Sequence, residues 1–271
     1  MLVILCIGLV VGAFGALLGI GGGVLLIPLL TAFIGVPIKT AIGASIISVI
    51  ATSSAAGAVY VGRGLTHSRL AMALEVATTA GALAGGITAV LLRPTVLEIF
   101  FALILLYVAI GMRKIPTEDG RPALTGFLDT SYIDPLTGKS VSYGVRNIGM
   151  GMGASFLAGN ISGLLGIGGG IIKVPIMTLV MGVPLRSSIA TSNFMIGITA
   201  ATSAVLYYRH GFVNPQIAIP AALGVLVGAQ IGSRVGGRLR NQRLKQFFQL
   251  LLVVFAVQMF VAALRGWLGT R

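Results

Sequence analysis

The chain has 271 residues, of which 56% are hydrophobic and only 9% are charged, and its mean hydropathy is +1.01. A soluble domain carries roughly 25% charged residues, so this composition excludes an ordinary water-soluble enzyme. The net charge of +13 does not indicate nucleic-acid binding, because the basic residues stand mostly at the ends of apolar segments, as they do in membrane proteins. We therefore expect an all-α polytopic membrane protein in a lipid bilayer.

Ten apolar segments recur along the chain, and we expect each to be a helix. Their predicted bounds are 2–18, 24–34, 40–61, 70–92, 95–112, 147–165, 171–181, 187–208, 215–233 and 244–264. A polar connection separates the first five from the last five. The sequence therefore predicts a first transmembrane repeat at 1–112, a cytoplasmic connection at 113–146 and a second transmembrane repeat at 147–271.

The second half repeats the first with a constant offset of 147 residues. A glycine-rich stretch at Gly19–Gly23 returns at Gly166–Gly170, and each is closed by a proline, Pro28 or Pro175. Other matched pairs include Val36-Pro37 with Val183-Pro184, Ser45 with Ser192, Thr52 with Thr199, Tyr60 with Tyr207, Gly81 with Gly228 and Gly85 with Gly232. The match needs no gap over roughly a hundred residues, which indicates an internal duplication.

The segments that follow the two glycine stretches are too short to cross a membrane. Eleven residues, as in 24–34, make only about 16 Å of helix, against a hydrocarbon core of about 30 Å. If each short segment turns back, it forms a re-entrant hairpin with the segment before it. Each repeat then adds three further transmembrane helices, and the two repeats are inverted relative to each other.

The distribution of Lys and Arg favours this inverted arrangement. In it, thirteen basic residues share one face, namely Arg63, Arg69, Arg113, Lys114, Arg121, Lys139, Arg146, Arg186, Arg234, Arg238, Arg240, Arg243 and Lys245. The other face receives five, Lys39, Arg93, Arg209, Arg265 and Arg271. Parallel repeats, in which each broken segment crosses once, divide them ten to eight. The positive-inside rule thus predicts both termini outside and the 113–146 connection in the cytoplasm.

Consecutive glycines call for an explanation beyond helix packing. Separated glycines such as Gly81 with Gly85 allow two helices to approach closely. Three in a row instead unwind a helix and expose backbone polar groups, which a membrane protein tolerates only beside protein or a wet cavity. The half-helices that begin there would aim free N–H groups and positive dipole ends at that cavity, which suits an anion. The predicted substrate-binding glycines are Gly21, Gly22, Gly23, Gly168, Gly169 and Gly170.

Lys173 is the sharpest single candidate for anion binding, because it lies three positions beyond the second triple glycine, where the first repeat has Leu26. A lysine inside a membrane needs a cavity, a carboxylate or an anion. The alternatives are snorkelling to an interface or a structural pair with Glu75 or another acidic residue. Further candidate donors near the glycines could each instead satisfy helix backbone; they are Ser45, Ser48, Thr52, Ser53, Asn160, Ser162, Thr191, Ser192, Asn193 and Thr199.

Other kinds of site find little support in the sequence. His67 and His210 stand alone in loop sequence without the partners that a metal needs, and we expect both at an interface. Glu75 is expected near the start of its helix, in an interfacial ion pair, with proton coupling as the alternative. The glycine stretch fails the spacing of a dinucleotide-binding motif, and no nucleophile motif is present. We expect no catalysis, no metal and no cofactor.

The doubled Gly-x-Gly-Gly-Gly motif with its proline, the two Val-Pro pairs and Ala190-Thr191-Ser192 resemble the TauE/SafE family of membrane transporters. The resemblance covers nearly the whole chain. It implies transport of sulfite, sulfonates or related organic anions across the bacterial inner membrane, usually as export, by a secondary transporter that uses no ATP. The repeats differ, since Ala44 stands opposite Thr191 and no cation stands opposite Lys173.

The sequence therefore predicts a secondary transporter that carries a small sulfur-containing anion by alternating access, with the anion held at the two glycine tips. Three alternatives stay open: an anion channel lined by the same tips, a transporter of another small organic anion, and a membrane interaction module that docks through residues 113–146. The coupling ion, a proton or sodium, the oligomeric state, including a homo-oligomer, and the direction of transport are not fixed by the sequence.

Overall fold

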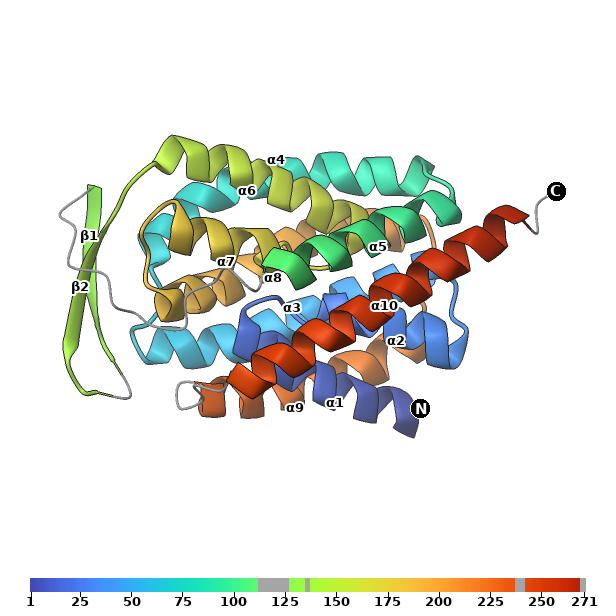
Figure 1. Cartoon of the computed structure of the whole chain (residues 1–271), viewed down its shortest axis with the longest axis horizontal. Helices are drawn as coiled ribbons and strands as arrows, with labels where there is room; N and C mark the ends of the chain where they lie inside the picture. The colour runs from blue at the N-terminus through green and yellow to red at the C-terminus, as the bar shows by residue number, and fades with distance from the viewer. Residues whose placement is uncertain (112–126, 135–136, 237–241, 269–271) are drawn as a thin grey trace.

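The computed structural model describes residues 1–111, 127–134, 137–236 and 242–268, which form ten helices and two strands (Figure 1). The first repeat contains α1 (Leu2–Leu18), α2 (Gly23–Ile34), α3 (Ile38–Gly62), α4 (Ser68–Leu91) and α5 (Pro94–Gly111). A hairpin of β1 (Phe127–Ile133) and β2 (Ser140–Val145) follows. The second repeat contains α6 (Ile148–Leu165), α7 (Gly170–Leu179), α8 (Leu185–Arg209), α9 (Pro215–Gly236) and α10 (Gln242–Leu268).

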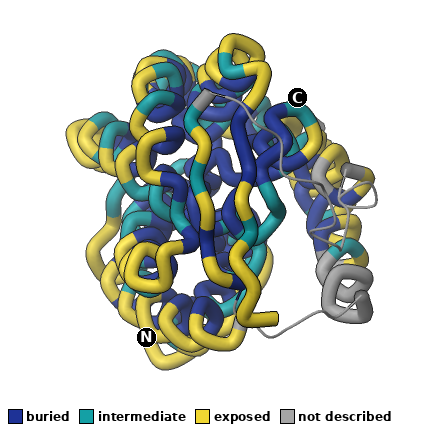
Figure 2. The backbone as a smooth tube through the Cα atoms, turned by 90° about the vertical axis from the view of Figure 1, so that its left-hand side faces the viewer, coloured by how far each residue is buried: buried dark blue, intermediate teal, exposed yellow. Residues whose placement is uncertain are grey.

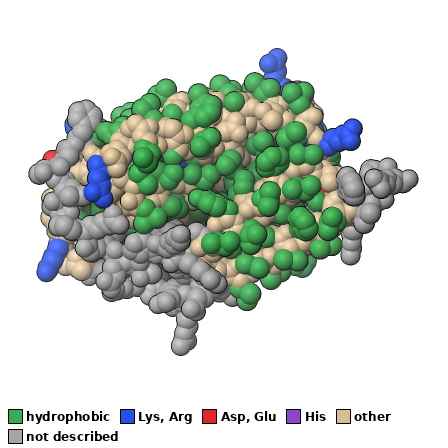
Figure 3. Space-filling model, turned by 45° about the horizontal axis from the view of Figure 1, so that its top comes forward, with side chains coloured by type: hydrophobic (Ala, Val, Ile, Leu, Met, Phe, Trp, Pro, Cys, Tyr) green, Lys and Arg blue, Asp and Glu red, His purple; other side chains and the backbone are tan. Residues whose placement is uncertain are grey.

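The predicted helical body is confirmed. All ten apolar segments are helices, and α1 has the predicted bounds. Five helices among the described residues are long and apolar enough to cross a membrane, namely α3, α4, α6, α8 and residues 215–235 of α9. The surface agrees with this, because on the face shown in Figure 3 apolar side chains cover the middle of the molecule while Lys and Arg side chains stand at its two ends. The chain is a polytopic, multi-pass membrane protein.

Each repeat packs its first helix against the fourth helix of the other repeat. These two interfaces, α1 with α9 and α4 with α6, are the most extensive in the molecule. Glycines make them close: a Cβ on Gly81 or Gly85 would collide with backbone of α6, and a Cβ on Gly228 or Gly232 would collide with backbone of α1. The predicted role of these separated glycines in helix packing is confirmed.

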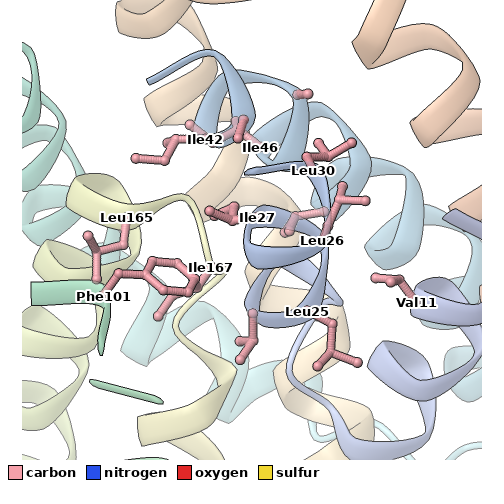
Figure 4. Packing of buried hydrophobic residues seen from close by; sticks show 14 of the residues in the cluster. Val11, Leu25, Leu26, Ile27, Leu30, Ile42, Ile46, Phe101, Leu165 and Ile167 are labelled. Atoms are coloured by element: carbon pink, nitrogen blue, oxygen red, sulfur yellow. The ribbon is translucent and has the colours of Figure 1, made fainter. Parts of the chain in front are cut away.

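The middle of the molecule lies between the third helices of the two repeats. α3 packs against α8, and the short helices α2 and α7 lie against them. Leu26, Ile27 and Leu30 of α2 meet Ile42 and Ile46 of α3 in a fully buried apolar cluster (Figure 4). Buried stretches accordingly lie inside the bundle and exposed ones around its outside (Figure 2).

Hydrogen bonds between helix ends show which helices begin or end at the hairpin end of the bundle and which at the opposite end. At the end near the hairpin, the Arg146 N–H donates to the Met181 carbonyl (3.1 Å), so the start of α6 lies beside the end of α7. At the other end, the Lys39 Nζ donates to the Val90 carbonyl (2.9 Å) and lies over the Phe212 ring. α1 begins at that second end, whereas α6 begins at the hairpin end (Figure 1).

The β-hairpin is a feature that the sequence analysis did not predict. It covers one end of the bundle: the Tyr143 hydroxyl hydrogen-bonds the buried Ser187 of α8, and Asp134 pairs with Arg186. Tyr132 and Val145 are also buried there. Much of the 113–146 connection, and its predicted boundary with the first repeat at 112–113, lies outside the described residues.

Candidate functional site

Glycine conformation creates the two breaks that separate α1 from α2 and α6 from α7. Gly21 and Gly22 have φ values of +76° and +77°, and their repeat equivalents Gly168 and Gly169 have +84° and +71°. L-residues with a Cβ rarely adopt these values. The chain thus reverses at each break, and α2 and α7 both begin in the middle of the structure. We call residues 19–23 and 166–170 the first and second tips.

The two tips pack directly against each other, and this explains the third glycine of each. Gly23 and Gly170 have ordinary helical backbone, but a Cβ on Gly23 would lie 2.6 Å from both the Gly166 carbonyl oxygen and the Ser45 hydroxyl. A Cβ on Gly170 would collide with the Gly19 carbonyl in the matching way. The first two glycines of each triple are therefore needed for their dihedral angles, and the third for its size.

Two serines join the tips across the repeats. The Ser45 hydroxyl of α3 donates to the Gly166 carbonyl of the second tip at 2.8 Å. Its equivalent Ser192 of α8 donates to the Gly19 carbonyl of the first tip, also at 2.8 Å. Both serines are fully buried. Each repeat therefore holds the tip of the other, and in this arrangement the two hydroxyl hydrogens are directed to backbone carbonyls.

Several backbone N–H groups at the tips have no hydrogen-bond acceptor among the described residues. The first N–H groups of any helix have no acceptor within that helix. Within the described parts of the chain, no hydrogen bond uses the N–H groups of Gly21–Gly23 or of Gly168–Gly170. These groups are buried, and both helices direct their positive dipole ends toward the same region. Val49 and Ile196, which are repeat equivalents, lie between the two tips and are close to Gly21 and Gly168 alike.

Lys173 is completely buried in α7 and is held by two partners. Its Nζ lies 3.5 Å from Oε2 of Glu75 on α4, with side-chain exposures of 0% and 8%, and donates to the Thr199 hydroxyl at 3.1 Å. The Thr199 hydroxyl in turn donates to Glu75 Oε1 at 2.6 Å. The alternative of a pair with Glu75, weighed from the sequence, is confirmed, and Lys173 does not snorkel to an interface.

The remaining predicted residues face elsewhere. Ser48 donates to the Ala44 carbonyl within α3. Asn160 lies where α6 packs against Gly81 and Gly85 of α4. Thr191 accepts a hydrogen bond from the His67 backbone N–H at 2.9 Å. Asn193 is nearer to the first tip, since its amide donates to the Ala16 carbonyl at 3.2 Å, while its Oδ1 is buried without a hydrogen-bond partner among the described residues.

Two expectations about titratable residues need correction. His67 lies in the connection between α3 and α4, as predicted, but it is not at an interface: it is 4% exposed beneath the hairpin, and its Nε2 is 3.0 Å from the Leu128 carbonyl oxygen. Glu75 is not interfacial either, because it is buried beside Lys173. Thr199 was weighed from the sequence as a hydroxyl donor on the helix after the second tip, and the structure places its hydroxyl between Lys173 and Glu75. The equivalent Thr52 donates to the Gly21 carbonyl of the first tip at 3.2 Å.

Comparison with known proteins gives the family of this chain. The sequence model of the family described as "Sulfite exporter TauE/SafE" matches residues 4–259, which is nearly the whole chain. The chain belongs to the TauE/SafE family. The resemblance seen in the glycine motifs is thereby confirmed, and membrane transport is the activity that the family description names.

Relatives of this TauE/SafE chain are also named as transporters. It is 24% identical over 265 residues to "Probable membrane transporter protein YunE" of Bacillus subtilis, covering 95% of this chain and 96% of the relative. It is 29% identical over 227 residues to a "Probable membrane transporter protein" of Xylella fastidiosa, covering 82% and 78%. A 64-residue stretch is 42% identical to "Sulfite exporter TauE/SafE family protein 5" of Arabidopsis thaliana, covering 24% and 14%. No solved structure matches the chain.

Proposed function

We propose that this chain is a secondary transporter that carries a small sulfur-containing anion, such as sulfite or an organosulfonate, and that the anion binds between the two glycine tips. The observation that carries the proposal is the meeting of two helix N-termini whose tip N–H groups are buried without acceptors among the described residues. Such N–H groups bind oxyanions without a formal charge of their own. Lys173 adds a cation on the side of the second tip.

The topology that we propose has inverted repeats, each with a re-entrant hairpin. In support, α6 and α7 have their outer ends together at the hairpin end, where Arg146 bonds Met181. α1 begins at the opposite end (Figure 1). The two hairpins then enter from opposite faces and meet inside the membrane, as in other transporters that are built from inverted repeats. We place the β-hairpin in the cytoplasm and both termini outside, in the bacterial inner membrane.

Transport requires the two tips to separate, because in the described arrangement they touch. Separation releases the Ser45 and Ser192 hydroxyls from the Gly166 and Gly19 carbonyls. The same hydroxyls are then available to donate to the anion, together with the tip N–H groups. Opening on one face and then on the other moves the bound anion across the membrane. Asn193 of α8, whose amide bonds Ala16 before the first tip, contributes beside them, whereas Ser48, Asn160 and Thr191 bond or pack elsewhere.

The substrate class rests on the family description and on the donor set. The names of the family and of the Arabidopsis relatives refer to sulfite export. A tetrahedral or pyramidal oxyanion presents several acceptors, which matches backbone N–H groups from two helices, hydroxyls and one ammonium. Export is the direction that the family description suggests for this chain.

Exchange in proteoliposomes tests the proposal. The purified chain is reconstituted with unlabelled sulfite or methanesulfonate inside, and uptake of the labelled anion is followed. We expect uptake of the labelled anion to saturate and to be faster when unlabelled anion is inside. The reason is that a carrier with bound anion returns to the outward-facing state faster than an empty one. Flux that does not saturate, accompanied by unitary currents in planar bilayers, would instead show an anion channel. Liposomes whose anion permeability does not rise above that of protein-free liposomes would contradict both.

A further inference from the structure

We propose that Glu75 is a proton-binding site that couples proton movement to anion movement, and that the anion takes the place of Glu75 beside Lys173. This inference rests on the function proposed above and assigns a coupling ion to it. It is carried by the buried group formed by Glu75, Lys173 and Thr199, which joins three helices of both repeats.

The other half of the duplicated fold has no charged pair at the equivalent positions. The repeat equivalents of Lys173 and Glu75 are Leu26 of α2 and Ala222 of α9, so the equivalent positions of the other half carry apolar side chains. Leu26 is fully buried there. Burying two charges in a membrane protein is unfavourable unless they are well paired. The duplicated fold thus accepts apolar residues at these two positions. We infer that Lys173 and Glu75 are charged for a functional reason.

The pairing is also incomplete. Glu75 Oε1 accepts a short hydrogen bond from Thr199, but Oε2 is buried, lies 3.5 Å from Lys173 Nζ and has no hydrogen-bond partner among the described residues. A buried carboxylate oxygen in that position is easily satisfied by a proton. Lys173 in turn holds Glu75 at ion-pair distance and can exchange it for a better-placed anion without moving far.

The position of the group links it to the tips. Thr199 is the repeat equivalent of Thr52, whose hydroxyl bonds the first tip at Gly21. Lys173 belongs to the first turn of α7, directly after the second tip, and contacts Thr199. Because Lys173 follows the second tip by three residues on the same helix, we infer that an anion bound at that tip competes with Glu75 for its ammonium.

Charge balance then ties the anion to a proton. In the described state the Lys173 ammonium and the Glu75 carboxylate sum to zero. A monovalent anion that binds Lys173 leaves the carboxylate without a partner in a medium where an isolated charge is strongly disfavoured. One proton on Glu75 restores neutrality. The Lys173 ammonium then pairs with the anion, and the Glu75 carboxylate becomes a neutral carboxylic acid. The anion and the proton move together, in equal numbers and without net charge.

Few other charged or titratable side chains of the described residues lie close enough to Glu75 to influence its protonation. Glu75 is surrounded by α4 itself, α6, α7 and α8. Lys173 is the charged side chain of the described region that acts on Glu75, and Thr79 and Thr199 are its hydrogen-bonding neighbours. α6 has no titratable side chain. In α8, Arg186, Tyr207, Tyr208 and Arg209 lie in the terminal turns, away from Thr199.

The test uses methanesulfonate, which stays ionised at all accessible pH values and so cannot carry a proton itself. Proteoliposomes that hold a pH dye receive an inward methanesulfonate gradient, with the membrane potential clamped by potassium and valinomycin. For the natural chain we expect the interior to become acidic, with about one proton taken up per anion. The rate of methanesulfonate uptake should be the same at every value of the clamped potential, because no net charge moves. For Glu75→Gln we expect the ratio of protons to anions to fall at least tenfold. The matched control is Glu98→Gln on α5, whose half-buried carboxylate is outside the group and whose ratio should equal that of the natural chain.

The outcomes separate the two proposals. Methanesulfonate uptake that responds to the potential and moves no protons overturns the coupling role and leaves the transporter intact, as does a ratio that survives Glu75→Gln. No anion movement by the natural chain overturns the transporter itself. Should Glu75→Gln fold poorly, the double variant Glu75→Ala with Lys173→Leu copies the apolar pair of the first repeat. It should remain monodisperse and lose methanesulfonate-driven proton uptake, and retention of that uptake would also overturn the inference.

Discussion

At the scale of single residues, the three glycines of each tip serve two different purposes. Gly21, Gly22, Gly168 and Gly169 supply left-handed backbone, whereas Gly23 and Gly170 supply space for the opposite tip. The motif is thus a turn followed by a contact surface. This division makes separate predictions for positions that look alike in the sequence.

Gly170→Ala should lower the thermal unfolding temperature in detergent, because its methyl group would collide with the Gly19 carbonyl and lie 2.8 Å from the Ser192 hydroxyl. Overpacking of this kind destabilises by about 1–3 kcal/mol. The control is Gly153→Ala on α6, where a Cβ meets nothing within 4 Å and alanine favours the helix. Equal unfolding temperatures for the two variants would contradict the tight packing of the tips.

Ser45→Ala and Ser192→Ala should have similar effects, since the two serines make equivalent bonds. Each leaves a buried carbonyl without its hydroxyl donor, a loss of about 1–3 kcal/mol in the free energy of unfolding. Both should also weaken anion binding. Ser54→Ala is the control, because that exposed hydroxyl bonds only its own helix. Variants that match the natural chain in unfolding and in anion titrations would remove both roles from these serines.

At the scale of elements, the helices were predictable and their long-range partners were not. Apolar segments with glycine breaks determine α1 through α10 locally, and the separated glycines indicated close packing. The pair of Lys173 with Glu75 joins helices far apart in the chain, so it could be weighed only as an alternative. The hairpin docks through Tyr143 and Arg186, contacts that no local pattern reveals. His67 was expected at an interface because the hairpin that covers it was not predicted.

Docking of the hairpin over His67 predicts a dependence of stability on pH. Burial lowers the pKa of His67 below its ordinary value of 6.5, although the Leu128 carbonyl partly opposes this shift. The unfolded chain therefore binds the proton more readily, so this contribution to stability is present above about pH 6.5 and is lost as the pH falls below it. Between about pH 7.5 and about pH 5.5, the unfolding temperature of the natural chain should fall more than that of His67→Asn. Identical pH profiles would show that His67 does not limit the docking.

At the scale of the whole molecule, the two repeats interlock. The first helix of each repeat packs on the fourth helix of the other, and the third helix of each repeat bonds the tip of the other. Because each repeat bonds the tip of the other, we expect opening at one tip to change the contacts of the other. Five helices of spanning length, an apolar surface and basic ends place this body across a membrane.

The proposed orientation predicts which ends of the molecule are labelled from outside. In a Cys6→Ser background, Lys139→Cys in the hairpin loop should react with an impermeant maleimide only after the cells are opened. Arg93→Cys, at the opposite end between α4 and α5, should react in intact cells, since both positions are exposed. Labelling of both positions from the same side would contradict inverted repeats with outer termini.

The central claim is that an anion binds between the tips beside Lys173. Calorimetric titration of the purified, monodisperse chain with sulfite, compared with Lys173→Leu, tests it most directly, because leucine already occupies the equivalent position in the first repeat. We predict saturable binding to the natural chain and at least tenfold weaker binding to a variant that elutes identically in gel filtration, a difference of about 1.4 kcal/mol or more. Equal affinity of the two proteins for sulfite would contradict the account.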